Sequence, residues 1–292
     1  MSGRIGERGQ ASPEWIGLVL LVALALAALA AAGVRIPGTD LARALAARLV
    51  CAAGLGSGCG EEGELVAAYG PELAALLAEQ SPRILYEDGM RAVPVDFRSC
   101  RNDRCADGPE SGSVTRSLRG ERVTAFVHVV DCRDPEAAEG SDCTDERAGN
   151  VYLQYWLYYP GSRTLGAVLG DRGFHDDDWE SLQVRAAEDQ VDARASSHHG
   201  YNYRGGARNW ASDLGLVSRD AWGENPGTYF VSGGSHAGHV SGSAKDAARF
   251  TSPGALRLIP IESLGGELAT RFAVTPPWRK RVYRDPEYEG TD

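Results

Sequence analysis

The sequence predicts a mainly β protein, an antiparallel β-sandwich with short N-terminal helices that follows a single transmembrane helix. Short runs rich in Val, Tyr, Trp and Ile recur through the second half of the chain, and Gly, Asn and Asp residues separate them. No long helical pattern follows residue 80. Short strands between turn residues are typical of sandwiches.

Several segments have the composition of strands. They are 123–130, 151–159, 181–186, 191–197, 228–231 and 256–261. Val93, Val95 and Phe97 also alternate like a strand. Upstream, 41–50 has the apolar spacing of a short amphipathic helix, and 64–80 predicts a second helix that breaks at Pro71.

The apolar segment 16–34 contains no charged residue. At about 1.5 Å per helical residue it is long enough to cross a bilayer core. Arg4 and Arg8 precede it, which favours a cytoplasmic N-terminus and an exported C-terminal part. We therefore expect a single-pass cell-membrane protein. Its expected parts are a leader at 1–15, a transmembrane helix at 16–34, a linker with a short helix at 35–63 and an extracytoplasmic sandwich at 64–292.

The residues before the apolar segment, Arg8 to Trp15, resemble the class III processing site of Flp and Tad pilins, which are type IV pilin-like proteins. The resemblance implies cleavage after Gly9, with Glu14 as the fifth residue of the mature chain, and pilin-like subunits as partners. Placing a carboxylate at the edge of a membrane helix costs free energy, so Glu14 is expected to have a role such as contact with a neighbouring subunit. A plain signal anchor and a secretory signal cleaved near residues 28–30 are the alternatives.

Six cysteines lie after the apolar segment and before the His-rich half of the chain. An even number beyond a membrane segment indicates disulfides in an oxidising compartment. Six cysteines allow fifteen pairings, and spacing alone does not choose among them. We expect the local pairs Cys51–Cys59, Cys100–Cys105 and Cys132–Cys143, with buried free thiols as the alternative.

The formal net charge of −10 argues against a nucleic-acid partner, because phosphate binding requires basic patches. Such acidity suits an extracytoplasmic surface or a domain that attracts cations. It also promotes solubility without any further role.

An acidic run, Gly173 to Glu180, holds one His, three Asp and one Glu. Alternate residues of an extended segment face the same side, so Asp178 and Glu180 point one way while Trp179 points into the core. His175 closes in from the preceding turn. Carboxylates with one imidazole predict a divalent metal ion, Ca or Mg rather than Zn, and a merely solvated acidic turn is the alternative.

Five of the six histidines fall in three short motifs of the second half, and His128 is the exception, expected to be a core or surface residue. The other two motifs contain His199 and His236. Either ring is a candidate general acid or base. A single histidine is more often a satisfied polar group, but the joint occurrence of the motifs favours a site.

The order of these motifs resembles that of the vacuolar-protein-sorting-associated family and the necrosis-inducing-protein-like cytolysins. The matching segments are Tyr155 to Pro160, His175 to Glu180, Ser197 to Gly200, and Gly234 to Ala237. The resemblance implies a β-sandwich with a divalent metal ion at one end. It carries the motif's His, Asp and Glu onto His175, Asp178 and Glu180. Ser162 stands near a position where the cytolysins have an Asp.

Two classes of function follow from these observations. The first is a membrane-anchored, metal-binding protein that acts in surface binding or pilus-related interaction, with a glycan or lipid headgroup as ligand. The second is a metal-dependent hydrolase of phosphoesters or esters, or a lytic toxin-like domain. A hydrolase needs a titrating base and an open metal position, whereas a binding protein needs neither.

Overall fold

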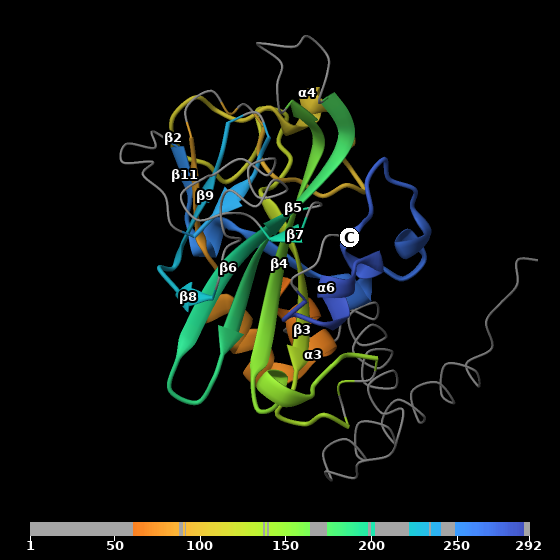
Figure 1. The fold of residues 1–292 in the computed structure, drawn as a ribbon. Coiled ribbons are helices and arrows are strands. Elements are labelled where there is room, and N and C mark those ends of the chain that lie inside the picture. Colours follow the sequence, from red (N-terminus) through yellow and green to blue (C-terminus); the bar gives the residue numbers. More distant parts are fainter. Residues whose placement is uncertain are drawn as a thin grey trace, which may run out of the picture. The chain divides into compact units, whose positions relative to one another are not determined.

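The computed structural model describes residues 61–87, 90, 92–136, 138, 140–163, 174–197, 200–201, 222–233, 235–240 and 249–288 (Figure 1). Glu64–Asp292 forms one compact unit. Several expected features lie outside the described residues: the transmembrane helix at 16–34, Gly9 and Glu14, the Cys51–Cys59 pair, and His199. Within the described ranges, no helix is both long and apolar enough to span a bilayer.

Two β-sheets make up the described structure. The first has the order β10-β9-β1-β11-β2, and its strands are β10 (Gly238–His239), β9 (Thr228–Val231), β1 (Arg83–Tyr86), β11 (Arg249–Thr251) and β2 (Gly112–Ser113). The second has the order β12-β3-β4-β5-β6-β7, and its strands are β12 (Arg257–Pro260), β3 (Thr124–Asp131), β4 (Val151–Arg163), β5 (Phe174–Ala186), β6 (Val191–Ser197) and β7 (Gly200–Tyr201); β8 (Gly223–Glu224) pairs with β6. The described helices are α3 (Glu61–Glu79), α4 (Asp103–Ala106) and α6 (Arg281–Arg284).

The mainly β class is confirmed, but both sheets are mixed rather than antiparallel. β1 pairs with β9, β11 with β2, and β12 with β3 in parallel. Period-two burial in a sequence reports which face of a strand is covered and carries no information about the direction of the neighbouring strand. The antiparallel expectation holds for the long ladder β3-β4-β5-β6.

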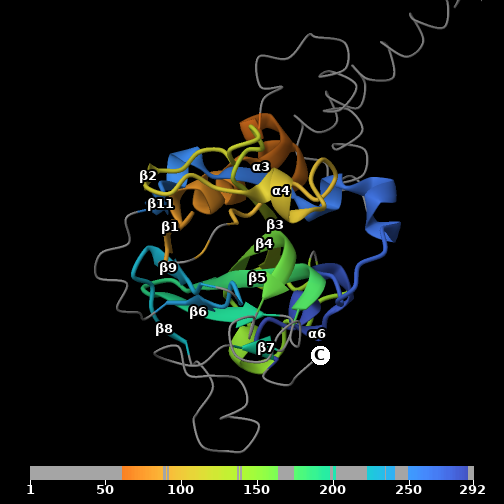
Figure 2. The same ribbon diagram turned by 90° about the horizontal axis from the view of Figure 1, so that it is seen from above.

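Both faces of the second sheet are covered. On one face, an aromatic cluster of edge-to-face and tilted rings joins β3, β4 and β5 to the chain that follows β12, residues 261–288, called the C-terminal segment below. The members of the cluster are Phe97, Phe126, Tyr158, Trp179, Phe272 and Trp278. On the other face, Tyr155 of β4 donates a hydrogen bond to the carbonyl of Leu77 in α3, at 2.7 Å. Figure 2 shows this second layer, in which α3 lies on the same side as β1, β2 and β11. The second sheet is therefore a buried central layer.

The start of β5 and the expected strand at 93–97 differ most from the sequence prediction. β5 begins at Phe174, so the acidic run is part of a strand that pairs with β4 from Arg163 to Val151. The expected strand at 93–97 is wrong, although Val93 and Val95 are buried. Their amides donate to the carbonyls of Ala106 and Tyr158 on separate elements, and Pro94 has no amide hydrogen with which to continue a ladder.

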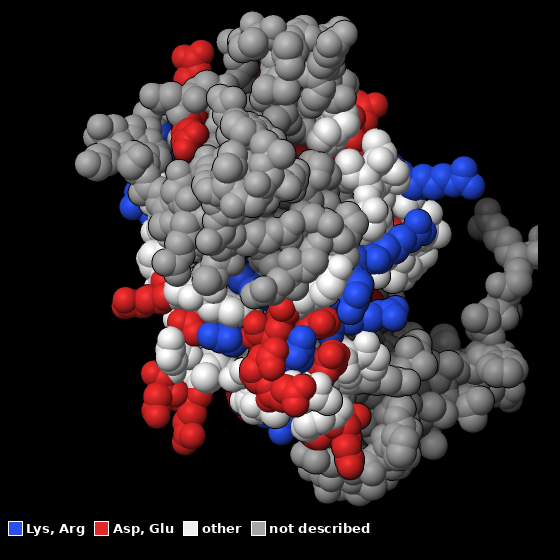
Figure 3. Space-filling model, viewed as in Figure 1, with Lys and Arg blue, Asp and Glu red and all other residues white. Residues whose placement is uncertain are grey.

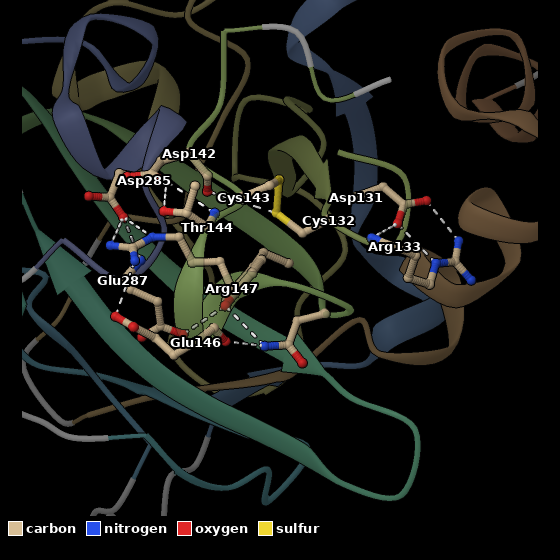
Figure 4. The surroundings of a disulfide bond; sticks show 12 residues. Asp131, Cys132, Arg133, Asp142, Cys143, Thr144, Glu146, Arg147, Asp285 and Glu287 are labelled. Atoms are coloured by element: carbon tan, nitrogen blue, oxygen red, sulfur yellow. Dashed lines mark hydrogen bonds and ion pairs between the residues drawn. A yellow bond between two sulfur atoms is a disulfide. The ribbon is translucent and has the colours of Figure 1, made fainter. Parts of the chain in front are cut away.

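The structure confirms the two disulfides within its described residues, Cys100–Cys105 and Cys132–Cys143. Figure 4 shows Arg147, which lies between this disulfide loop and β4 and pairs with Asp285; its Nη2 is 2.7 Å from Asp285 Oδ1. This ion pair fixes the loop between β3 and β4 against the C-terminal segment.

Acidic side chains gather on the lower part of the face shown in Figure 3. Exposed acidic residues occupy the β3–β4 and β5–β6 connections, namely Glu136, Asp142, Asp145, Glu146, Glu188 and Asp189. These connections lie at the same end of the antiparallel ladder, and the β4–β5 connection lies at the opposite end. The acidic surface is thus separate from the end of the sheet that carries Asp178.

Helix α3 is two helical segments joined at a kink, as Pro71 predicted. Gly70 has φ 80° and ψ 168°, a backbone conformation that is almost restricted to glycine. An added Cβ at Gly70 would meet no heavy atom within 4 Å. Backbone strain is therefore the cost of any side chain at this position.

We predict that Gly70→Ala lowers the free energy of unfolding by about 1–3 kcal/mol, because alanine must adopt the same strained conformation. Gly254→Ala is the matched control, since Gly254 has equally open space and no positive φ. Urea unfolding of both variants measures the difference. Equal stabilities of the two variants contradict the assignment of strain to Gly70.

A polar cluster ties α3 to the second sheet. The carboxylate of Glu262 contacts the Tyr69 hydroxyl and His128 Nδ1, and the His128 ring stacks on Tyr283 with centroids 3.7 Å apart. The side chain of Glu262 is 38% exposed, and the packing around its carboxylate acts to raise its pKa, but the charge of His128 and hydrogen bonds from His128 and Tyr69 outweigh this effect, and the pKa is lowered. The folded state therefore favours the ionised carboxylate.

A carboxylate whose pKa is lowered by folding stabilises the protein above its unfolded pKa, about 4.3, and loses that contribution as the pH falls through the folded value. We expect Glu262→Gln to flatten the loss of unfolding free energy between pH 6 and the acid limit of folding. Urea unfolding across this range measures the slope. Glu267→Gln, which removes an exposed carboxylate of the neighbouring segment, should retain the wild-type slope.

Candidate functional site

Two carboxylates lie side by side on one face of β5. Asp178 pairs with Tyr159 and Glu180 with Leu157 in the β4–β5 register, so both point away from the aromatic cluster. Asp178 is 0% exposed and Glu180 is 2% exposed. The structure confirms that Asp178 and Glu180 share a face and that Trp179 enters the core.

His236 reaches Asp178 from the turn between β9 and β10 in the other sheet. Its Nδ1 lies 3.0 Å from Asp178 Oδ2, across 58 residues of sequence. The ring is buried and stacks on Tyr159 with centroids 4.1 Å apart. When Nδ1 carries the proton it donates to Asp178, and Nε2 is then the acceptor of a neutral ring.

The backbone around this contact is strained. His236 has φ 55° and Asp177 has φ 58°, a left-handed conformation that non-glycine residues rarely adopt. Such residues cluster at binding and catalytic sites, where the surrounding structure holds them in place. Here the Asp178 bond and the Tyr159 stack hold His236.

Gly238, at the start of β10, brings the two sheets close together. Its amide donates to Glu180 Oε2 at 3.4 Å. A Cβ at Gly238 would lie 1.6 Å from the Tyr229 hydroxyl oxygen, so no side chain fits here. Tyr229 of β9 therefore places its hydroxyl beside Glu180.

Two phenol hydroxyls face the carboxylates. Tyr159 and Tyr229 are both fully buried, and neither hydroxyl has a hydrogen-bond partner among the described residues. Burial first, and then the negative charges of Glu180 and Asp178, raise the pKa of Tyr229 well above its ordinary value. Burial likewise raises the pKa of Tyr159, with added contributions from Tyr86, Tyr229 and the same carboxylates. Both phenols are therefore neutral hydrogen-bonding groups.

The opposite face of β5 carries a separate polar contact. Asp177 accepts hydrogen bonds from Arg101 Nη2 at 2.8 and 2.9 Å, from the Tyr158 hydroxyl at 2.5 Å, and from the amide of Ala273 at 2.8 Å. Arg101 also lies over the ring of Phe272, 4.9 Å from its centroid. Asp177 is thus a structural anchor for the C-terminal segment.

The structure brings together three of the predicted site residues: Asp178, Glu180 and His236. His175 is not shown with them: its Nδ1 is 2.7 Å from the carbonyl of Asp177. No three His, Cys, Asp or Glu side chains of the described ranges are close enough to bind one metal ion together. Membership of His175 in a metal site stays a prediction, as does a catalytic role for His199.

Sequence reasoning missed Tyr159, Tyr229 and Gly238. The aromatic run of β4 predicted a strand, but nothing in it distinguished Tyr159 from its neighbours. Tyr229 lay in a predicted strand whose partner was unknown. The run Gly233-Gly234-Ser235-His236 was the only signal for a tight turn beside this site.

A scan of the chain against protein-family models finds no match, and a search among curated proteins finds none. Solved structures that resemble the fold at low identity include NLPPya in complex with mannosamine, 16% identical with a TM-score of 0.35, covering 72% of this chain and 89% of that chain. NLPPya in complex with glucosamine is 17% identical, with a TM-score of 0.37 and coverages of 72% and 86%. The non-toxic HaNLP3 protein is 14% identical, with a TM-score of 0.34 and coverages of 66% and 76%.

These structures are necrosis-inducing-protein-like (NLP) proteins.

Proposed function

We propose that this chain is a membrane-anchored, extracytoplasmic binding protein whose β-sandwich holds a divalent cation at Asp178 and Glu180. The observation that carries the proposal is the pair of buried carboxylates beside the imidazole of His236. Carboxylate oxygens are the ligands that Ca²⁺ and Mg²⁺ prefer, and burying two carboxylates is costly unless charges or hydrogen bonds compensate.

The donor set fits such an ion. Asp178 and Glu180 would supply oxygen ligands from one strand face, and the imidazole of His236 holds Asp178 through a hydrogen bond, so the ion would keep waters as its remaining ligands. The hydroxyls of Tyr159 and Tyr229, which have no hydrogen-bond partner among the described residues, provide further polar contacts beside the carboxylates. A bound cation supplies positive charge to this acidic site and can coordinate ligand hydroxyls or phosphates.

The proposal also includes a membrane anchor and a ligand for the bound cation. The uncharged segment 16–34 is the membrane span, and the disulfides Cys100–Cys105 and Cys132–Cys143 suit an oxidising compartment outside the cytoplasm. We propose a glycan or a lipid headgroup as ligand, because both offer oxygen atoms to a cation. Processing at Gly9 and assembly with pilin-like subunits through Glu14 belong to the same proposal.

Cation binding by the full-length chain in detergent tests the metal site. We expect the Asp178→Asn, Glu180→Gln double variant to weaken Ca²⁺ or Mg²⁺ binding by about 100-fold or more, since it removes both carboxylate ligands. Isothermal titration calorimetry gives the dissociation constant, and elemental analysis gives the metal content.

The matched control is Asp176→Asn with Glu188→Gln, which removes two exposed carboxylates, one of them on the same strand. Its affinity should equal that of the wild type. Equal affinity of the wild type and the Asp178, Glu180 variant rejects the assigned site. A His175→Ala variant decides whether His175 contributes a ligand.

One observation favours a hydrolase as the second candidate. The Asp178 contact orients the His236 ring as a carboxylate orients a catalytic base, and His236 has a strained backbone. Ser235 is adjacent, but the sequence lacks the G-x-S-x-G turn of a nucleophile elbow.

If His236 is a general base, the wild type will hydrolyse an aryl phosphate or an aryl ester, because the basic ring nitrogen takes a proton from the attacking water. We expect His236→Gln, which keeps a polar side chain without a basic nitrogen, to reduce this rate by about 100-fold or more. Initial rates of the two proteins under the same conditions measure the difference. No turnover by the wild type across these substrates leaves the binding function as the one supported.

A further inference from the structure

The strongest unexplained feature of the buried site is its pair of phenol hydroxyls. Tyr159 belongs to β4 of one sheet and Tyr229 to β9 of the other, so their hydroxyls approach the carboxylates from two layers. Both side chains are 0% exposed, and neither hydroxyl has a hydrogen-bond partner in the described part of the chain.

Other buried tyrosines of the same core do have partners. Tyr155 donates to the carbonyl of Leu77 at 2.7 Å, and the Tyr86 hydroxyl lies 2.9 Å from Thr251 Oγ1. Buried polar atoms in native proteins are nearly always paired with protein atoms, ordered water or an ion. Tyr159 and Tyr229, beside Asp178 and Glu180, have no such partner among the described residues, and a bound polar species would supply one.

The position of Tyr229 supports this reading. Its hydroxyl lies against Gly238, whose amide is bonded to Glu180. The absence of a Cβ at Gly238 lets the hydroxyl come this close to the carboxylate. Tyr159 is directly opposite Asp178 in the β4–β5 register, and paired residues of an antiparallel ladder point to the same face, so its ring lies on the face that carries both carboxylates.

We propose that Tyr159 and Tyr229 bind a water ligand of the divalent cation and so position its hydration shell between the two sheets. This inference rests on the proposed cation site. The described residues do not provide three acidic, histidine or cysteine ligands at one point, and a hard cation with so few protein ligands keeps several waters. Each such water donates hydrogen bonds, and a neutral phenol oxygen accepts them.

The two tyrosines act as positioning residues, because they touch the water and not the cation. They also select for a hydrated ion: an ion that loses its waters on binding gains nothing from the hydroxyls. Loss of groups that support metal ligands typically weakens metal binding by about 10- to 100-fold.

The test is the Tyr159→Phe, Tyr229→Phe double variant of the full-length chain, which removes both hydroxyls and keeps both rings. We expect its dissociation constant for Mg²⁺ to rise by about tenfold or more. In excess chelator its thermal midpoint should be equal to or above that of the wild type, because no protein partner of the hydroxyls is lost.

The matched control is the Tyr86→Phe, Tyr155→Phe double variant, which removes two hydroxyls that have protein partners. It should lower the thermal midpoint in chelator and leave the Mg²⁺ dissociation constant unchanged.

Three results would overturn the inference. Equal Mg²⁺ affinity of the wild type and the Tyr159, Tyr229 variant shows that the hydroxyls do not support the ion, and the cation site itself then stands. A variant that loses the same stability in chelator and in Mg²⁺, with unchanged affinity, shows that the hydroxyls hold a structural water instead. A wild-type protein that binds neither Mg²⁺ nor Ca²⁺ removes the cation site and this inference together.

Discussion

The structure depends on one strand, β5, that carries carboxylates on both faces and is buried on both. Asp177 points to the aromatic side, where Arg101, Tyr158 and the amide of Ala273 surround it. Asp178 and Glu180 point to the other side, toward His236 and the amide of Gly238. Burying a carboxylate without compensation is costly, so each face of this strand must be closed by a specific partner. The C-terminal segment closes the first face, and the β9–β10 turn closes the second.

The parts of the fold that the sequence predicted are those whose residue composition alone identifies them. Strands β3, β6 and β9 were predicted because β-branched and aromatic residues dominate them and turn residues bound them. The two described disulfides were predicted because their cysteines are close in sequence. The first half of β5 was not predicted as a strand, because an Asp-rich run has the composition of a solvated turn. Its pairing with the second half of β4, from Arg163 to Leu157, makes it a strand.

The site was predictable in part for the same reason. Alternation along an extended segment placed Asp178 and Glu180 together without any knowledge of the fold. The position of His236 beside Asp178 depends on the parallel pairing of β9 with β1. A local sequence pattern encodes neither the direction of a strand nor its partner. The role of Gly238 depends in turn on Tyr229, a contact between two strands that only the register defines.

The contact between Asp178 and His236 joins two different sheets, and this has a mechanical consequence. Within each sheet, backbone ladders fix neighbouring strands, whereas the hydrogen bonds described above between β5 and the β9–β10 hairpin run through the side chains of Asp178 and Glu180, to the His236 ring and the Gly238 amide. A small slide of one layer over the other changes the spacing between Asp178 and His236 before it breaks any ladder. A ligand that contacts both sheets would therefore change their relative position. Conversely, a displacement of either sheet would weaken the binding of that ligand.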